Sequence, residues 1–487
     1  MRSTVADSGI ALRLARIPAF PRRVHLIGVG GTAMAALAGM LVERGLSVTG
    51  SDKQLYEPTE SLLRSSRVGL MTGFSPANLS PAPDLVVVGN AIVASNPEVV
   101  ALLDSAIPYL SMPEALWHFF LNGRRVLMVA GTHGKTTSTA MMAHVLSAAG
   151  RDPSMLVGGV AVDFGSNYRL GRGADFVIEG DEYDTAFFDK GPKFLHYRAG
   201  AAIITAVEFD HADIYRDLEH VKSSFRALVE QMDSSRLLAV CADFPHALEV
   251  SAPARSRRLT YGLHAGEYRA ADVAVGADGA RFSVTCNGDR VQASIHLPIG
   301  GRMNVANALG VYVLLSELGV SGDEIAGGLR TFKGVLRRQQ VIGEAAGVTV
   351  VDDFAHHPTA IGVTLEAIAE RFPGRRILAA FEPRSNTARR NVFQNAFAAA
   401  FDRASRVYLG PVYFKENDPI APGERLETGA LASAISARGA RAIACVSNDE
   451  ILERMLSDAR AGDVALFMSN GPFDGLKERF LAALQAK

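Results

Sequence analysis

Short apolar runs that suit buried strands alternate, along most of the chain, with stretches in which apolar residues recur at helical spacing. The first run, Val24–Val29, leads through a glycine-rich turn into a stretch that carries Leu37 and Leu41 on one helical face. Further strand-like runs at 46–49 and 84–88 end in small polar residues. Strands that alternate with helices in this way predict an α/β fold with parallel sheets.

The alternation of strand-like runs with helical stretches starts again at two later points of the chain. A second block opens with the strand Arg125–Ala130 and a helix that reaches about residue 149. Its later part, 233–297, has shorter β-leaning runs, which we interpret as further strands of the central sheet with an antiparallel addition. A third block with four strand-like runs starts at Phe332. We therefore predict an N-terminal extension and three domains, at 1–22, 23–118, 119–331 and 332–487.

Composition narrows the class of protein. Hydrophobic residues make up 48% of the 487 residues, enough for several cores, and the net charge of −1 gives no basic surface for nucleic acid or an anionic membrane. No run approaches the roughly 20 apolar residues that cross a bilayer, and residues 1–22 contain no signal-peptide core. The three cysteines are far apart and predict no disulfide framework. These features predict a cytoplasmic protein, and nothing in them predicts an obligate protein partner.

The strand Arg125–Ala130 runs into a glycine-rich turn and a helix, an arrangement that binds phosphate through backbone N–H groups. Lys135 adds a positive charge, and Thr136 offers a hydroxyl to Mg²⁺. Position 129 is Val where the usual phosphate-loop pattern has Gly, so the loop is shorter than most; a plain strand–helix turn is the alternative. The predicted nucleotide-binding residues are Gly131, Thr132, His133, Gly134, Lys135, Thr136 and Thr137.

Acidic residues follow two later strands of the same block. Glu179 comes after the run Phe176–Ile178, and His211 lies between Asp210 and Asp213 after the next strand. Mg²⁺ prefers oxygen ligands, so carboxylates at strand ends beside a phosphate loop predict a magnesium site. The alternative interpretations are a solvated acidic loop and a structural histidine.

The first glycine-rich turn fits the dinucleotide fingerprint, with an acidic residue placed to reach a ribose. The same geometry holds any nucleotide diphosphate, and nothing later in the chain supplies hydride-transfer chemistry. A nicotinamide oxidoreductase and a plain tight turn are therefore the weaker alternatives. The residues concerned are Gly28, Gly30, Gly31, Thr32 and Asp52.

Three motifs together resemble the Mur ligase family over residues 23–487. They are the shortened phosphate loop Gly131–Thr137, the opening segment His25–Gly31 and the segment Val351–Pro358. The resemblance implies a three-domain α/β architecture: a Rossmann-like N-terminal domain for a UDP-sugar, a central P-loop ATPase-like domain, and a Rossmann-like C-terminal domain for the incoming amine. It also implies an ATP-dependent ligase that forms an amide bond through an acyl phosphate.

The resemblance implies roles for particular residues. Lys135 and Thr136 would serve the ATP phosphates and Mg²⁺, and Glu179 and His211 would be metal and active-site residues. The remaining positions that it assigns to the ATP site are Asn304, Asn307, Arg338 and Asp353. From the residues alone, Asn304 and Asn307 would be a helix cap and a surface amide.

One departure from the family concerns a carbamylated lysine that several members use as a metal ligand. Near the expected place this chain has Arg226, and Lys222 comes too early. We therefore do not assign a carbamylated lysine, and the way in which a second Mg²⁺ would be held stays open.

Four stretches resemble the branch that joins the tripeptide L-alanyl-γ-D-glutamyl-meso-diaminopimelate to UDP-N-acetylmuramate in cell-wall recycling. They are 89–91, 181–190, 382–387 and 468–471. We predict that Asn90 meets the UDP-sugar. Arg384, Ser385 and Asn386 follow a third-domain strand at its carboxyl end, where open α/β sheets bind ligands, and the guanidinium of Arg384 suits a peptide carboxylate, so we predict that these three residues meet the peptide. The rival interpretations are the branch that adds free L-alanine, and a nucleotide-binding regulatory protein without ligase chemistry. For Arg384 itself, a surface ion pair is the alternative.

Overall fold

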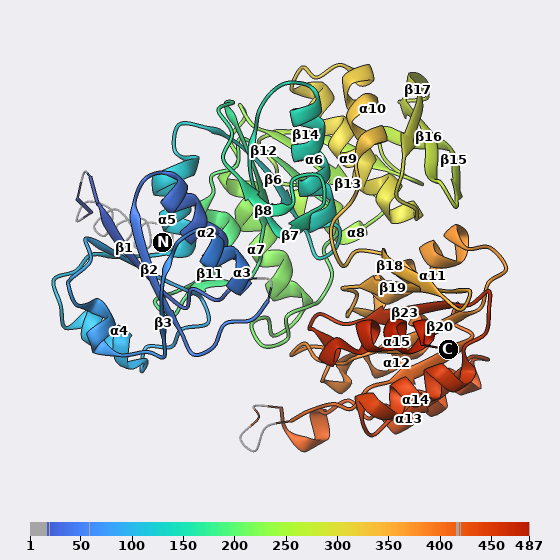
Figure 1. Cartoon of the computed structure of the whole chain (residues 1–487). Helices are drawn as coiled ribbons and strands as arrows, with labels where there is room; N and C mark the ends of the chain where they lie inside the picture. Colours follow the sequence, from blue (N-terminus) through green and yellow to red (C-terminus); the bar gives the residue numbers. More distant parts are fainter. Residues whose placement is uncertain (1–16, 19, 58, 415–417, 419, 487) are drawn as a thin grey trace.

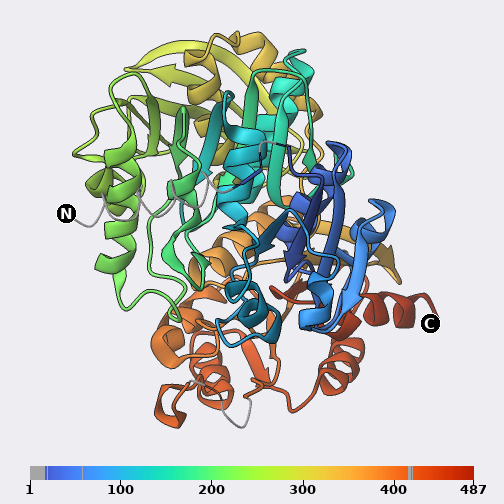
Figure 2. The same ribbon diagram turned by 90° about the vertical axis from the view of Figure 1, so that its left-hand side faces the viewer.

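The fold is described from a computed structural model. It describes residues 17–18, 20–57, 59–414, 418 and 420–486, so most of the predicted N-terminal extension lies outside the described residues. Three sheets with their helices form three domains, coloured in Figure 1 from blue through green and yellow to red. The middle domain lies against both of the others (Figures 1 and 2).

The N-terminal domain is a five-stranded parallel sheet in the order β3-β2-β1-β4-β5, the nucleotide-binding order with its crossover beside β1. Its strands are β1 (Arg23–Ile27), β2 (Ser47–Asp52), β3 (Gly69–Thr72), β4 (Leu85–Val88) and β5 (Tyr109–Ser111). Its helices are α2 (Thr32–Glu43), α3 (Thr59–Ser65), α4 (Pro97–Leu103) and α5 (Met112–Leu116), and a π-helical turn at Trp117–Leu121 follows.

The middle domain has ten strands in one sheet, parallel from β15 to β7, with antiparallel pairs β15–β16, β16–β17 and β7–β8 at its ends. In spatial order they are β17 (Asp289–Leu297), β16 (Gly279–Cys286), β15 (Tyr268–Gly276), β14 (Arg257–Gly262), β13 (Leu237–Cys241), β12 (Ala201–Ile204), β6 (Arg125–Ala130), β9 (Asp175–Gly180), β7 (Ser154–Ala161) and β8 (Ser166–Arg169). Its helices are α6 (Lys135–Ala148), α7 (Leu218–Gln231), α8 (Pro245–Ser251), α9 (Arg302–Glu317) and α10 (Gly322–Thr331). The predicted antiparallel addition is confirmed as β15–β17.

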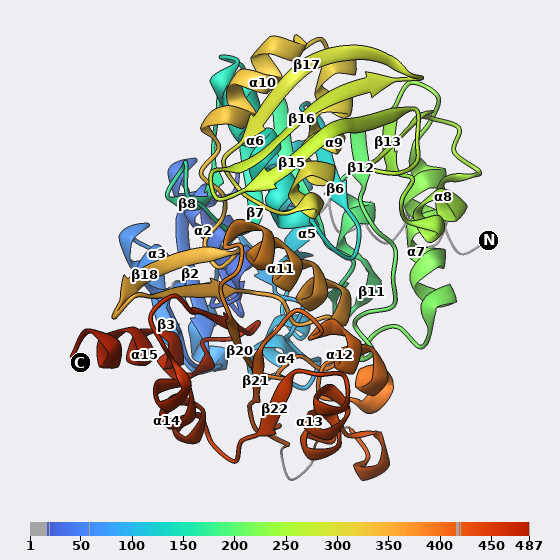
Figure 3. The ribbon, with the colours of Figure 1, turned by 90° about the vertical axis from the view of Figure 1, so that its right-hand side faces the viewer.

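The third domain has six strands, of which only β18 is antiparallel to its neighbour. In spatial order they are β18 (Gln340–Ala345), β19 (Val348–Asp353), β23 (Val464–Met468), β20 (Ile377–Phe381), β21 (Arg406–Leu409) and β22 (Arg441–Ala444). Its helices are α11 (Pro358–Arg371), α12 (Gln394–Ala400), α13 (Thr428–Ala437), α14 (Asn448–Asp458) and α15 (Leu476–Gln485). Helix α11 lies between this sheet and the strands β15–β17 (Figure 3).

Alternate residues of the central strands face two different cores, as strand geometry requires. On β6, Leu127 and Val129 pack against α6 and α9, whereas Met128 belongs to a cluster that continues into the N-terminal domain. A hairpin of β10 (Asp184–Ala186) and β11 (Asp189–Pro192) makes a second connection, because Phe187 and Phe188 at its tip pack against the N-terminal core. The first two domains are therefore joined by continuous apolar packing.

The strand predictions differ from the structure mainly at strand ends. β6 has the predicted bounds, but β9 continues through Glu179 and Gly180, which were expected to follow the strand. The β7–β8 hairpin was not predicted, because glycines interrupt its apolar pattern. Among the described residues, no helix is long and apolar enough to traverse a bilayer. The predicted domain limits stay predictions.

Candidate active site

The phosphate loop takes a backbone path that only glycine adopts without strain. Gly131 has φ +136° and Gly134, the N-cap of α6, has φ +79°. A Cβ on Gly131 would overlap Thr205, and one on Gly134 would overlap the side chain of Asn307. Thr132 N donates to Ala206 O at 2.8 Å, which holds the loop against β12. The N–H groups at the start of α6 are thereby presented at the end of the sheet, as an anion site requires.

Lys135, the first residue of α6, turns its ammonium back over the loop. Its Nζ donates to Gly131 O at 2.5 Å and to Glu182 Oε1 at 3.0 Å. Burial opposes the charge, but the carboxylates of Glu182 and Glu179 outweigh burial and raise the pKa of Lys135. The lysine therefore stays charged in the position predicted for a phosphate-binding cation.

The buried Thr136 and the half-buried Glu179 place a pair of oxygens beside Lys135. Thr136 Oγ1 donates to Glu179 Oε1 at 3.0 Å, and Gly158 N donates to Glu179 Oε2 at 2.7 Å. Burial raises the pKa of Glu179 despite the nearby positive charge of Lys135. A hydroxyl and a carboxylate held together suit a hard cation such as Mg²⁺, so the residues present fit the predicted metal.

His211 reaches the same cluster through Glu182, a residue that the sequence analysis did not single out. His211 Nε2 lies 3.0 Å from Glu182 Oε1, and its ring packs against Tyr183 at a tilt of 49°, with centroids 4.1 Å apart. Burial would lower the pKa of His211, but the hydrogen bond to Glu182 and the charge of Asp210 raise it. The signal that could have identified Glu182 is its place three residues after Glu179, at the end of the same strand.

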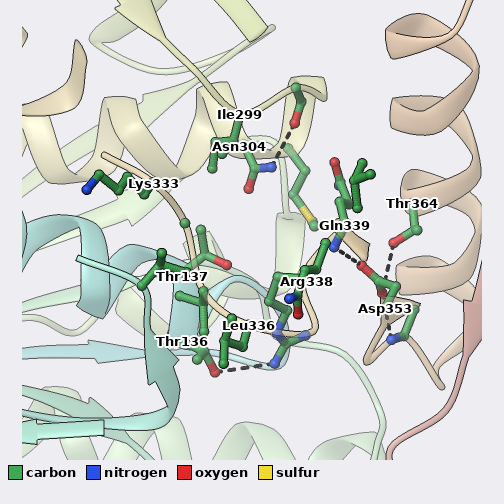
Figure 4. A pocket seen from close by; sticks show the side chains of 18 of the residues that line it. Thr136, Thr137, Ile299, Asn304, Lys333, Leu336, Arg338, Gln339, Asp353 and Thr364 are labelled. Atoms are coloured by element: carbon green, nitrogen blue, oxygen red, sulfur yellow. Dashed lines mark hydrogen bonds between the residues drawn. The ribbon is translucent and has the colours of Figure 1, made fainter. Parts of the chain in front are cut away.

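A cavity of about 360 Å³ opens next to the phosphate loop, between the middle and third domains (Figure 4). Its size falls within the range of small-molecule sites. The polar residues that line it come from the phosphate loop, the start of α9, the segment before β18 and the end of β19. They include Thr136, Thr137, Asn304, Arg338, Gln339 and Asp353.

Arg338 and Asp353 connect the third domain to this cavity. Arg338 Nη2 donates to Thr136 Oγ1 at 3.3 Å, and its guanidinium lies 4.9 Å from the centroid of the Phe354 ring. Asp353 accepts backbone hydrogen bonds from Gln339 and Ala355, each at 2.7 Å. Burial raises the pKa of Asp353, although Arg338 acts against this. The structure therefore brings both predicted residues to the phosphate loop.

Asn304 and Asn307 are both buried in α9, so their interpretation as a helix cap and a surface amide was wrong. Gly301 is the N-cap of that helix. Asn304 lines the cavity and donates to Gly300 O at 2.8 Å, whereas Asn307 donates to Asn304 Oδ1 at 3.3 Å. Asn307 also packs on Gly134, so it supports the phosphate loop from behind.

A second cluster, formed by His133, Glu208 and His357, connects the phosphate loop to the start of α11. His133 Nε2 lies 2.6 Å from Glu208 Oε2, and one ligand-type atom of each residue lies within 4.8 Å of the others. Both ring nitrogens of His357 are already engaged, with Phe209 O at 3.2 Å and with Thr359 N at 3.3 Å. This geometry makes the cluster a hydrogen-bonded contact between domains.

The loop that carries His211 also contacts the segment predicted to bind peptide. Asn386 Nδ2 donates to Asp213 Oδ2 at 2.9 Å, and Ala212 N donates to Thr387 Oγ1 at 3.1 Å. Ser385 Oγ accepts from Ala388 N at 3.0 Å. Asn386 therefore takes part in a contact between the middle and third domains. This contact was not predicted, whereas a role of Asn386 in peptide binding was.

Arg384 lies beside a second cavity, of about 440 Å³, at the carboxyl end of β20. Its side chain is 53% exposed, and its Nη1 lies 3.6 Å from Glu382 Oε1. The surface ion pair considered as an alternative is therefore present, although it is long and leaves most of the guanidinium accessible. The residues that line this cavity are Glu382, Pro383, Arg384, Arg389, Tyr413 and Phe414.

The first glycine-rich turn is closed by Asp52. Asp52 Oδ2 accepts from Gly30 N at 2.9 Å, and Gly28 N donates to Ser51 O at 2.8 Å. Gly28 has φ +83° and packs on Ile92. The nearby Gly31, Thr32 and Asn90 are exposed. The predicted UDP-sugar residues thus share one edge of the N-terminal sheet. Their role in binding a UDP-sugar stays a prediction.

The two basic residues considered in place of a carbamylated lysine lie in α7. Lys222 Nζ makes an ion pair with Glu249 Oε2 at 2.6 Å, and Arg226 pairs with Glu219 and Glu249. Lys222 is buried and Arg226 is half-buried, and these ion pairs engage both side chains with carboxylates of α7 and α8.

Comparisons with known proteins agree with this geometry over nearly the whole chain. Three family descriptions match: "Mur ligase family, catalytic domain" at residues 23–123, "Mur ligase middle domain" at 129–315, and "Mur ligase, glutamate ligase domain" at 337–471. The chain is 36% identical to the UDP-N-acetylmuramate–L-alanyl-γ-D-glutamyl-meso-2,6-diaminoheptandioate ligase of Escherichia coli, over 96% of this chain and 99% of that protein. It is 34% identical to the UDP-N-acetylmuramate–L-alanine ligase of an Anaeromyxobacter species, over 96% and 98%.

Solved structures show the same architecture. A murein peptide ligase from Psychrobacter arcticus superposes with a TM-score of 0.71 at 33% identity, covering 96% of this chain and 99% of that one. A UDP-N-acetylmuramate–alanine ligase from Thermotoga maritima gives a TM-score of 0.77 at 26% identity, covering 95% and 99%. Fold and site together define an ATP-dependent ligase that forms an amide bond. The chain belongs to the Mur ligase family.

Proposed function

We propose that this ligase joins the tripeptide L-alanyl-γ-D-glutamyl-meso-diaminopimelate to UDP-N-acetylmuramate, with Mg²⁺ as the ion that accompanies ATP. The observation that carries the proposal is the cavity beside Arg384, whose volume of about 440 Å³ is in the range that holds drug-sized molecules. A single alanine would fill a small part of it. Arg384 in its wall suits a peptide carboxylate, whereas Arg389 in the same wall is already paired with Asp418.

The residues around Lys135 support phosphorylation of the sugar-borne carboxylate. In this proposal the γ-phosphoryl group of ATP moves to the lactyl carboxylate of UDP-N-acetylmuramate and gives an acyl phosphate. Two anions must meet in that step, so the charge of Lys135 and the N–H groups of the phosphate loop supply the stabilisation that they need. Bound Mg²⁺, held by Thr136 and Glu179, would add a further positive charge beside the phosphates.

The peptide amine then attacks the acyl phosphate, and phosphate leaves from a tetrahedral intermediate. Arg384 would hold a peptide carboxylate so that the amino end faces the sugar site. Because Arg338, Asp353 and Arg384 come from the third domain and Lys135 from the middle domain, the reaction needs these domains to be closed. The hydrogen bonds of Asn386 and Thr387 with the His211 loop support this part of the proposal, because they join the two domains.

A second candidate function is ligation of free L-alanine, which relatives of similar identity catalyse according to their names. An acceptor panel separates the two. Purified protein with ATP, Mg²⁺ and UDP-N-acetylmuramate is given the tripeptide, the dipeptide L-alanyl-γ-D-glutamate or L-alanine, and phosphate release and the joined product are measured. We expect kcat/KM for the tripeptide to exceed that for L-alanine by at least 100-fold. A preference for L-alanine would overturn the proposal, and the absence of any product would remove the UDP-sugar assignment as well.

A further inference from the structure

Arg337 is a half-buried arginine that no step of the proposed reaction uses. It precedes Arg338 in the chain, but of these two neighbours only Arg338 lines the cavity beside the phosphate loop. The guanidinium of Arg337 lies instead at the turn that follows β23, where its Nη2 donates to Ser469 O at 2.7 Å and to Gly471 O at 2.5 Å. Arg337 is therefore placed to fix the shape of this turn.

The turn Ser469–Gly471 supports the side chain of Arg384. A Cβ on Gly471 would lie 2.5 Å from both Cδ and Nε of Arg384, so the stem of this arginine lies directly on the glycine. Ser469 Oγ donates to Glu382 and accepts from Gly471 N at 2.9 Å, and Glu382 Oε1 lies 3.6 Å from Arg384 Nη1. The turn thus contacts Arg384 directly and also through Glu382. A shift of the turn would therefore change the direction of the Arg384 guanidinium.

The turn depends on a donor because two of its carbonyl oxygens meet at one nitrogen. Ser469 O and Gly471 O belong to buried residues, and a buried carbonyl without a donor is costly. Nη2 of Arg337 carries two hydrogens, one for each oxygen, and the positive charge of the guanidinium opposes the repulsion between the two oxygens. An ammonium has no planar fork of this kind. An arginine is therefore the side chain that this turn requires.

Arg337 is itself held by the segment that carries Asp353. Its Nε donates to Asp352 Oδ2 at 3.3 Å, and Phe354 N donates to Arg337 O at 2.8 Å. The Phe354 ring has its centroid 5.3 Å from the guanidinium carbon of Arg337 and 4.9 Å from that of Arg338. Arg337 also has φ +61°, a left-handed conformation that is strained for a residue with a side chain and tends to occur at functional sites. The end of β19 therefore fixes both arginines.

We propose that Arg337 is a positioning residue for the peptide site, which holds the turn Ser469–Gly471 and through it sets the direction of Arg384. The inference rests on the proposed role of Arg384 in binding a peptide carboxylate. Arg337 itself lines neither of the two cavities. The two neighbouring arginines thus serve different substrates, because Arg338 faces the ATP cavity directly and Arg337 acts on the peptide through Arg384.

The test compares variants of the full-length ligase by steady-state phosphate release. Arg337→Met should raise the KM for the tripeptide about tenfold, because misplacing a substrate-binding group can cost up to about 100-fold. The KM for ATP and for UDP-N-acetylmuramate should be unchanged. Arg337→Met/Arg384→Ala should have the same KM for the tripeptide as Arg384→Ala alone, since Arg337 acts through Arg384. The matched control is Arg376→Met, which removes another third-domain arginine that donates to a carboxylate and a backbone carbonyl, those of Asp463 and Asp458, and should leave the KM unchanged.

Hydrogen–deuterium exchange gives a second measurement that does not depend on the reaction. The N–H groups of residues 469–471 should exchange about tenfold faster in Arg337→Met than in the wild type or in Arg376→Met, because the turn loses its hydrogen bonds to a charged group. Thermal unfolding shows whether Arg337→Met is folded. If it is not, Arg337→Lys keeps a positive charge beside Asp352 and should change the KM and the exchange rates in the same direction by a smaller factor.

Three results would overturn the inference. They are an unchanged KM for the tripeptide in a folded Arg337→Met, an equal rise in the KM for ATP, and additive losses in the double variant with Arg384→Ala. A wild type that accepts no tripeptide would instead overturn the proposed function. The exchange rates of the turn, with the KM for the amine that the wild type does accept, would then decide the inference.

Discussion

The ammonium of Lys135 lies 2.9 Å from Oε2 of Glu182, and both side chains are buried at the end of the central sheet. Each charge is tolerated there because the other is present. Removing one partner of such a pair leaves an uncompensated buried charge, which costs about 3–5 kcal/mol. The pair therefore connects the chemistry of the site to the stability of the fold.

Lys135→Met should remove activity and lower stability together. We expect kcat for ATP-dependent ligation to fall about 1,000-fold or more, because the developing phosphoryl charge loses its main cation. UDP-N-acetylmuramate binding, measured by calorimetry, should be unchanged. Lys135→Met/Glu182→Gln should recover most of the lost free energy of unfolding but no activity. A double variant as unstable as the single one would show that the charge pair does not explain the loss.

Gly134→Ala should weaken nucleotide binding through two separable effects. The left-handed backbone costs an alanine about 1–2 kcal/mol, and the added Cβ overlaps Asn307. We expect the Kd for ATP to rise at least tenfold. Gly134→Ala/Asn307→Ala removes only the overlap, so ATP binding measured by calorimetry should recover in part. Full recovery would mean that the backbone conformation is unimportant.

Arg384→Ala should raise the KM for the tripeptide and leave the KM for ATP unchanged. A hydrogen bond to a charged group contributes about 1.5–3 kcal/mol, so the expected rise is about 10- to 100-fold. Steady-state phosphate release at varied tripeptide concentration measures it. Arg438→Ala, which removes an exposed pair with Asp402 elsewhere in the third domain, is the matched control. An unchanged KM for the tripeptide would take Arg384 out of the peptide site.

The hydrogen bond between Asn386 and Asp213 should contribute to catalysis through domain closure. We expect Asn386→Ala and Asp213→Ala each to lower kcat/KM for the tripeptide about tenfold, and the double variant to be no worse than either, because both remove one contact. The measurement is a double-mutant cycle in kcat/KM. Additive losses would show that the two side chains act independently.

The stability of the protein should depend on pH through His357. Burial, with the nearby His133, lowers the pKa of His357 to about 4, whereas free histidine titrates near 6.5. Between these values the unfolded chain binds a proton that the folded chain does not, so stability falls as the pH falls from 6.5 to 4. The loss should approach roughly 3 kcal/mol, from 1.36 kcal/mol per pKa unit.

His357→Asn should reduce this pH dependence while keeping a residue that can cap α11. Urea unfolding of both proteins at pH 7 and pH 4.5 measures the effect. An equally steep loss of stability in the variant would show that another group titrates in this range.

The parts of the site that depend on local geometry could be predicted from the sequence. The phosphate loop is specified by Gly131, Gly134 and Lys135 within five residues, because a tight turn, an anion site and a helix start all require those residue types there. The three sheets could likewise be predicted from the alternation of strands and helices, because the apolar pattern of each strand is local in the sequence.

Long-range contacts could not be predicted in this way. Glu182 looks like one more acid in a solvated loop until folding places it against His211, 29 residues further along the chain. Asn307 looks like a surface amide until α9 packs behind Gly134. The contact of Asn386 with Asp213 depends on how two domains meet, and a single chain pattern carries no signal for that.

The hairpin with Phe187 and Phe188 at its tip begins two residues after Glu182, and the two rings pack against the core of the N-terminal domain. The acids predicted to serve ATP and the domain predicted to hold the UDP-sugar are thus joined through this hairpin. We expect thermal motion to change the distance between the ATP site and the sugar carboxylate very little. The conformational entropy that is lost when the amine is brought into place would then be lost by the third domain alone.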